Sequence, residues 1–242
     1  MLELRNISYE AEGNEILRDV SLTINDRFVA VTGPNGGGKS TLAKIIMGMV
    51  TPTSGQIFLD GEELTNLSIT ERANRGISYA FQQPVHFKGL RVKDLLNLAC
   101  GKDTGLCDAC QVLSEVGLCA RDYLERELNN TLSGGELKRI EIAMSLARGA
   151  KLSIFDEPEA GIDLWSFQNL IHVFEKMEER LHGNILIISH QERVLNIADK
   201  IVYIKGGTVE RYGTREEILP EIFAGEHVCD MLTDKLLPAA KK

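Results

Sequence analysis

The sequence lacks any apolar run that approaches the roughly 18 residues of a membrane-spanning helix. It also lacks the basic start and apolar centre of a secretory signal peptide. Residues 1–7 instead alternate apolar and polar side chains, a pattern typical of a β-strand. We therefore expect a cytoplasmic protein.

A basic surface is also missing. The chain has 35 acidic and 27 basic residues, a net charge of −8, and no stripe of Lys and Arg. Proteins that bind duplex nucleic acid normally carry such a stripe, so we expect no nucleic-acid partner. A small anion is not excluded, because a helix N-terminus and a single lysine can bind phosphate groups within an acidic protein.

Cysteine is sparse and odd in number, which does not fit the disulfide framework of a secreted protein, so we expect reduced thiols. Cys107 and Cys110 have the spacing of metal ligands, but a single C-x-x-C pair is weak evidence. Buried thiols and a metal site therefore both stay open for this pair. The five cysteines are Cys100, Cys107, Cys110, Cys119 and Cys229.

The spacing of apolar residues is mostly strand-like at first, then helical, and then alternates between the two along the 242 residues. No internal repeat is present. Alternation predicts strands at residues 2–8, 15–24, 28–32, 55–59 and 76–81, with a helix at 39–49. Spacings of three and four residues then predict helices at 92–98, 109–116 and 137–146. Strands at 151–155, 184–189 and 200–205 alternate with helices at 164–181 and 191–198, and a helix follows residue 214.

This alternation predicts an α/β fold with a mostly parallel sheet, an additional antiparallel β part and an inserted α-helical subdomain. We expect one domain over residues 1–242, with the core at 1–85 and 150–215. The helical subdomain would take residues 86–149 and a C-terminal extension residues 216–242.

A glycine-rich turn between a predicted strand and a predicted helix matches the P-loop pattern G-x-x-x-x-G-K-[ST]. Its glycines allow backbone N–H groups to converge on phosphate oxygens, and the helix that follows adds its positive end. Lys39 would reach the β- and γ-phosphates of ATP, and the Ser40 hydroxyl would ligate Mg²⁺. The ATP-binding residues predicted here are Gly33, Pro34, Asn35, Gly36, Gly37, Gly38, Lys39, Ser40 and Thr41.

An acidic pair follows the predicted strand at 151–155 and would complete the site. Asp156 would hold Mg²⁺, and Glu157 would act as the general base on the attacking water. An acidic pair after an apolar run is by itself more often a solvated strand end. The P-loop in the same chain favours the catalytic interpretation.

A second glycine turn, at residues 132–136, opens the predicted helix at 137–146 and would offer backbone N–H groups to another anion. Beside an intact P-loop, such a site would be redundant for the same nucleotide in the same subunit. Its residues are Leu132, Ser133, Gly134, Gly135 and Glu136.

With these three motifs, residues 1–215 resemble the ABC ATPases. The resemblance implies a RecA-like P-loop NTPase core and a head-to-tail homodimer formed on ATP, in which the signature of one subunit covers the ATP of the other. It also implies that Tyr9 stacks on adenine and that Gln82 touches ATP, metal and water. Asp163 would belong to the D-loop, and His190 would contact the γ-phosphate, so that Lys39, Glu157 and His190 form the catalytic group.

Four departures resemble the SufC-type ATPases of iron–sulfur cluster assembly. They are Glu136 in place of the usual Gln, Glu141 in place of a small apolar residue, and the segments 80–85 and 156–164. The resemblance implies a soluble SufB/SufD-like scaffold at the Q-loop and helical subdomain, about residues 82–98. The alternative is an integral membrane permease at the same surface. A nucleotide-gated interaction protein with little turnover is less favoured, because Glu157 and His190 are both present.

Overall fold

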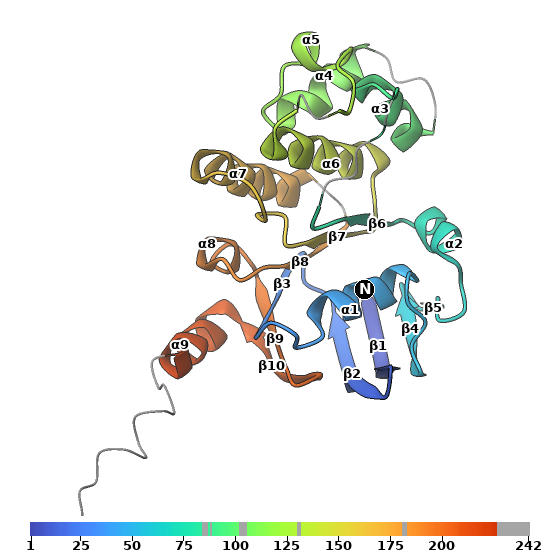
Figure 1. Cartoon of the computed structure of the whole chain (residues 1–242), viewed down its shortest axis with the longest axis vertical. Coiled ribbons are helices and arrows are strands. Elements are labelled where there is room, and N and C mark those ends of the chain that lie inside the picture. The colour runs from blue at the N-terminus through green and yellow to red at the C-terminus, as the bar shows by residue number, and fades with distance from the viewer. Residues whose placement is uncertain (84–86, 88, 102–105, 130–131, 181–182, 227–242) are drawn as a thin grey trace, which may run out of the picture.

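The computed structural model describes residues 1–83, 87, 89–101, 106–129, 132–180 and 183–226 (Figure 1). Its central sheet has the strand order β10-β9-β3-β8-β7-β6, and every neighbouring pair is parallel except β9 with β10. One strand, β8, separates the two strands that lead into the P-loop and into Asp156. The strands are β3 (Phe28–Thr32), β6 (Ile77–Ala80), β7 (Leu152–Asp156), β8 (Asn184–Ile188), β9 (Lys200–Lys205) and β10 (Thr208–Thr214).

A second, antiparallel sheet has the order β2-β1-β4-β5. Helix α1 (Lys39–Met47) buries Leu42, Ile45 and Ile46 in an apolar cluster that both sheets share. The α/β P-loop fold with an antiparallel part is thereby confirmed. The strands of this sheet are β1 (Leu2–Ala11), β2 (Asn14–Ile24), β4 (Ser54–Leu59) and β5 (Glu62–Glu63).

The region predicted as a helical insertion, residues 86–149, contains four helices among its described residues. Figure 1 shows its helices gathered at the end of the molecule opposite the antiparallel sheet. Helix α6 packs on α3 and α4 within this lobe and on α7 (Leu164–Arg180) of the core. The lobe contains α3 (Val92–Cys100), α4 (Leu106–Glu115), α5 (Ala120–Tyr123) and α6 (Gly134–Arg148).

Four short elements were not predicted, namely β5, α2 (Ile69–Asn74), α5 and β10, and one helix was predicted too long. Strand β10 has little apolar alternation because it lies at the sheet edge, and α2 is too short to show a helical period. The helix expected at 191–198 is only α8 (Glu192–Leu195). The helix predicted after residue 214 is α9 (Arg215–Glu226). No helix in the part of the chain described here has the length and hydrophobicity needed to cross a membrane.

One buried arginine ties α2 to α1. The Arg72 side chain, from α2, donates to the backbone carbonyls of Ile45 at 2.7 Å and Ile46 at 2.8 Å, at the C-terminal end of α1. It also donates to the carbonyls of Thr65 at 2.8 Å and Leu67 at 3.0 Å. Because the last carbonyls of a helix have no partner within it, Arg72 caps the helix that begins at Lys39.

Candidate functional site

The loop between β3 and α1 is held tightly by its neighbours. At Gly33 (φ +136°) an added Cβ would lie 1.9 Å from the carbonyl oxygen of Ile204, on β9. At Gly38 (φ +100°) it would lie 2.6 Å from Leu17 Cδ2, on β2. Both positions therefore need glycine for their backbone angle and for the close approach of a neighbouring strand.

Gly37 also has a packing role. An added Cβ would lie 3.0 Å from the carbonyl oxygen of Pro34 and 3.1 Å from that of Ile204, closer than most such contacts. The Gly37 amide donates to the same Pro34 oxygen at 3.1 Å. A side chain at position 37 would therefore require these carbonyls to move by a few tenths of an ångström.

Lys39 lies at the centre of the loop and is 5% exposed. Its ammonium group donates to the carbonyls of Gly33 and Pro34, both at 2.8 Å. Burial lowers the pKa of Lys39, and the nearby charges of Glu157 and Asp156 oppose that shift.

Asp156, at the end of β7, is 4% exposed and bonded through both carboxylate oxygens. The Ser40 hydroxyl donates to one at 2.9 Å and the Tyr79 hydroxyl to the other at 2.8 Å. Burial and the Asp156 carboxylate raise the pKa of Tyr79, which keeps its hydroxyl protonated as a donor. Ser40 and Asp156 are therefore brought together as predicted, and Tyr79 is a further partner that sequence reasoning missed.

Glu157 brings three predicted residues together. The Gln82 amide donates to its carboxylate at 2.5 Å, and His190 Nε2 lies 3.7 Å from the other carboxylate oxygen. Its backbone is in the left-handed region (φ +45°), which costs a non-glycine residue about 1–2 kcal/mol. The Glu157 amide is anchored to the Ile188 carbonyl at 2.9 Å, so the turn holds this conformation.

The second glycine turn begins α6, away from the P-loop in the chain and in the helical lobe. Ser133 is the N-cap and, with Glu136, forms a capping box. An added Cβ at Gly135 would lie 2.8 Å from Ser166 Cβ, and one at Gly134 would lie 3.2 Å from the Gly161 carbonyl oxygen. These glycines thus let the start of α6 pack closely against the turn before α7 and against the first turn of α7.

Glu136, unusual for its position, has two further partners. Tyr123 and Arg126 (3.3 Å) both donate to its Oε1, while the Ser133 amide donates to Oε2 at 2.6 Å. Burial would raise the pKa of Glu136, but the hydrogen bonds from Tyr123 and Ser133 and the charge of Arg126 lower it to about 2. The carboxylate therefore links the start of α6 to the end of α5 and the loop that follows it.

We predict that Glu136→Gln lowers the free energy of unfolding by about 1 kcal/mol at pH 7, because an amide loses the charged contact to Arg126. A carboxyl whose pKa is depressed by folding stabilises the fold above its unfolded pKa of about 4.3 and loses that contribution as the pH falls toward 2. Urea unfolding of both proteins at pH 7 and pH 3 measures this. A gap of equal size at both pH values would contradict the assignment.

Two predicted residues have ordinary structural partners. Tyr9 lies on β1 opposite Leu17, the residue that contacts Gly38, and it is half-buried against the shared apolar cluster. Asp163 accepts from the Ser166 amide at 3.0 Å and the Ser166 hydroxyl at 2.7 Å, at the start of α7. The stacking role of Tyr9 and the D-loop role of Asp163 stay predictions.

The cysteine hypothesis gains no support. Cys110 and Cys119 are exposed and Cys100 is half-buried, whereas the side chain of Cys107 and the whole of Cys229 lie outside the described residues. Among the described side chains, no three His, Cys, Asp or Glu residues gather in a way that could hold a metal ion.

The family model described as ABC transporter matches residues 17–160, which include the P-loop, the signature turn and the Asp156–Glu157 pair. The chain belongs to the ABC transporter family. It is an ATPase cassette of this family, and the predicted α/β P-loop architecture is that of its solved members.

Three similar proteins illustrate the relationship. An uncharacterised ABC transporter ATP-binding protein of Methanocaldococcus jannaschii is 37% identical over 227 residues, 90% of each chain. The spermidine/putrescine import ATP-binding protein PotA of Mesoplasma florum is 32% identical over 91% of this chain and 63% of its own length. A solved cassette dimer in a post-hydrolysis state, bound to ADP and Pi, has a TM-score of 0.76 and 26% identity, over 89% of this chain and 99% of that one.

These relatives are named as transporter ATP-binding proteins and not as SufC-type ATPases. The family-level prediction is thus confirmed, and the finer assignment to iron–sulfur cluster assembly finds no support among them.

Proposed function

We propose that two copies of this chain bind two ATP molecules between them and that their closure drives a membrane permease. The convergence of Ser40 on Asp156, and of Gln82 and His190 on Glu157, carries the proposal of ATP hydrolysis. The transporter part is supported by the names of the relatives.

In this mechanism the phosphate groups of ATP accept hydrogen bonds from the donors of the β3–α1 loop. The Lys39 ammonium exchanges the Gly33 and Pro34 carbonyls for oxygens of the β- and γ-phosphates. Backbone amides of residues 33–41 and the N-terminus of α1 bind the remaining oxygens, and Tyr9 stacks on adenine.

The metal donors fit Mg²⁺, which prefers oxygen ligands. Ser40 and Asp156 supply a hydroxyl and a carboxylate already within 2.9 Å of one another, and Gln82 supplies an amide oxygen. When bound, Mg²⁺ would neutralise charge on the transferred phosphate.

Hydrolysis itself then requires little covalent chemistry from the protein. Glu157 accepts a proton from the attacking water, Gln82 orients that water, and His190 donates to the γ-phosphate. The Ser133–Gly135 turn of the other copy completes the site from the opposite side. Each P-loop is therefore active only in an assembly.

A mixing experiment tests the shared site. Lys39→Ala removes the phosphate contact, and Ser133→Arg blocks the signature turn. Each variant alone should lose most ATPase activity, while a mixture should recover part of it, because a mixed dimer contains one intact P-loop facing one intact signature. Parent-level turnover by Ser133→Arg alone would sink the shared-site proposal.

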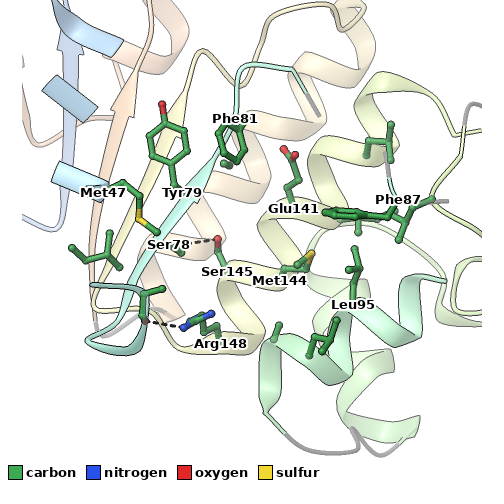
Figure 2. Close-up of a pocket in the computed structure, with 18 residues that line it drawn as sticks. Met47, Ser78, Tyr79, Phe81, Phe87, Leu95, Glu141, Met144, Ser145 and Arg148 are labelled. Carbon is green, nitrogen blue, oxygen red and sulfur yellow. Dashed lines mark hydrogen bonds between the residues drawn. The ribbon is translucent and has the colours of Figure 1, made fainter. Parts of the chain in front are cut away.

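The permease would dock in an apolar groove between the end of β6 and the lobe. The groove has a volume of about 350 Å³ and is lined by Phe81, Phe87, Leu95, Leu98 and Met144 (Figure 2). Phe81, Phe87 and Leu98 are exposed at 40%, 41% and 67%, which is unusual for large apolar side chains. Phe81, which lines the groove, is directly followed in the chain by Gln82. A displacement of Phe81 by the partner would therefore move Gln82 at the hydrolysis site.

A second candidate keeps the ATPase and replaces the permease with a soluble SufB/SufD-like scaffold. The observation that favours it is Glu141, which also lines the groove and adds a carboxylate to a mostly apolar surface. Glu141 forms an ion pair with the buried Lys138 at 3.5 Å. Capture of the tagged protein from its native lysate separates the candidates, because one partner is an integral membrane protein and the other is soluble.

We predict that Leu98→Asp abolishes co-purification of the partner while thermal stability and basal ATPase activity stay unchanged. The side chain is 67% exposed, so a carboxylate there costs the isolated fold little but would be desolvated in a complex. Leu98→Met is the matched control, since it preserves an apolar surface. Retained capture by the Asp variant would exclude this groove as the docking surface.

A further inference from the structure

Tyr79 is bonded to the proposed metal ligand Asp156 but has no part in the mechanism above. Its hydroxyl donates to Asp156 Oδ2 at 2.8 Å, while the Ser40 hydroxyl donates to Oδ1 at 2.9 Å. Asp156 is 4% exposed, so protein groups and not bulk solvent hold both of its oxygens. Because the two donors bind different oxygens, the carboxylate cannot turn about its Cβ–Cγ bond without breaking both hydrogen bonds.

The pairing of two strands fixes where the Tyr79 side chain starts. Strand β6 runs parallel to β7, and Tyr79 is paired with Ile154, two residues before Asp156. Residues two apart in a strand point to the same face of the sheet, so all three side chains share one face. Ile154 belongs to the apolar cluster shared by both sheets, and Tyr79 packs against that cluster. The Tyr79 side chain therefore extends along the sheet toward the end of β7, where its hydroxyl meets Asp156.

An aromatic neighbour restricts the ring further. The Phe81 and Tyr79 rings meet edge to face, with centroids 5.0 Å apart and an interplanar angle of 64° (Figure 2). This is one of the favoured arrangements of an aromatic pair. The Tyr79 ring is thus confined by Phe81 and by the apolar cluster, which limits where its hydroxyl can lie.

Tyrosine combines the reach and the charge that this position needs. Asp156 lies two residues, about 7 Å, further along the neighbouring strand, which is beyond the reach of a serine hydroxyl at position 79. A lysine or arginine could span this distance, but its positive charge beside Asp156 would oppose the binding of Mg²⁺. The tyrosine hydroxyl donates a hydrogen bond without adding a charge. It thus orients the carboxylate and leaves the negative charge available to the metal.

We propose that Tyr79 is a positioning residue that raises the affinity of the ATP site for Mg²⁺ by fixing the orientation of the Asp156 carboxylate. The inference rests on the metal site proposed above, in which Ser40 and Asp156 are donors. Loss of a hydrogen-bond partner of a metal ligand typically lowers metal affinity by about 10–100-fold. Without the Tyr79 hydroxyl, Asp156 stays in place but is less constrained, so the loss falls on metal binding and not on binding of the nucleotide alone.

The test uses Tyr79→Phe, which removes the hydroxyl and keeps the ring beside Phe81. Electron paramagnetic resonance of Mn²⁺, titrated into the protein with one equivalent of ADP, measures metal affinity without turnover. We expect Mn²⁺ to bind this variant about tenfold more weakly, while the affinity for ADP in EDTA stays near the parent value. In ATPase assays the Mg²⁺ concentration for half-maximal rate should rise by a similar factor, and kcat at saturating Mg²⁺ should stay within about twofold.

Tyr212→Phe is the matched control. The Tyr212 hydroxyl also donates to a carboxylate, that of Asp26 at 3.0 Å, but Asp26 precedes β3 whereas the P-loop follows it. This variant should bind Mn²⁺ as the parent does. Tyr79→Met is a second variant without the hydroxyl and should show the same weakening as Tyr79→Phe, since neither side chain donates a hydrogen bond. Thermal melts identify any variant that does not fold.

Parent-like Mn²⁺ affinity in Tyr79→Phe would overturn the positioning role. A weakening in Tyr79→Met alone would do the same, because it would assign the effect to packing of the ring. An equal loss of ADP affinity in EDTA would also overturn it, since the site as a whole would then be disturbed. A parent that binds Mn²⁺ with ADP while Tyr79→Phe is unchanged refutes only the role of Tyr79, whereas a parent that binds no Mn²⁺ refutes the proposed metal site itself.

Discussion

Replacing Glu157 with Gln is expected to lower kcat for ATP hydrolysis by at least about 100-fold while the affinity for ATP and Mg²⁺ stays near that of the parent. The change removes the group that accepts the proton of the attacking water. It preserves the shape of the side chain, so that the Gln82 amide still has an oxygen to donate to. Loss of the base without loss of binding is the signature of a group that acts in the chemical step.

The same variant should accumulate as an ATP-bound dimer, because hydrolysis is the step that would open it. Size exclusion with and without ATP, alongside phosphate release, measures both effects. Glu210→Gln is the matched control, since Glu210 is exposed on the edge strand β10. Unimpaired phosphate release by Glu157→Gln would falsify the assignment of the base.

The P-loop could be predicted from the sequence because its function is local. Gly33 and Lys39 belong to the same short loop, and the sequence pattern of that loop is enough to identify it. The pairing of Ser40 with Asp156 was also predictable, since both follow strands that run parallel to one another, and such strand ends meet at one edge of a sheet.

Tyr79 was not predictable in the same way. Its bond to Asp156 depends on β6 pairing with β7, and nothing in the composition of residues 76–81 indicates which strand they join. Lys138 is a similar case. It is 2% exposed and donates to the Phe81 carbonyl, immediately before Gln82, although its sequence context is that of a solvated helix residue. Only tertiary packing buries it, since α6 lies against the end of β6 and not in solvent.

The interpretation of Glu136 and Glu141 also changes when their neighbours in the structure are considered. From the sequence they favoured a subfamily and a partner. In the structure, Glu136 is bonded to Tyr123 and Arg126, and Glu141 is paired with Lys138. Both carboxylates thus have partners inside this chain.

Replacing Arg72 with Met is expected to lower the free energy of unfolding by about 3 kcal/mol, since hydrogen bonds to a buried charged group are each worth about 1.5–3 kcal/mol and part of this is offset by desolvation. The guanidinium donates to four backbone carbonyls and is 2% exposed. Met fills a similar volume but donates nothing. The carbonyls of Ile45 and Ile46 would lose their Arg72 donor at the buried end of α1.

This loss should reach the ATP site, because α1 is the helix whose first residues are Lys39 and Ser40. For a domain of this size, 3 kcal/mol corresponds to about 6–12 °C in melting temperature, and circular dichroism measures that change. Arg72→Lys should not rescue, because one ammonium group lacks the planar fork that reaches carbonyls from two segments. Arg75→Met is the control: its guanidinium pairs with Glu62 at the surface, so we expect a loss below about 1 kcal/mol. Equal melting temperatures for the Arg72 and Arg75 variants would show that the cap on α1 contributes no more than a surface ion pair.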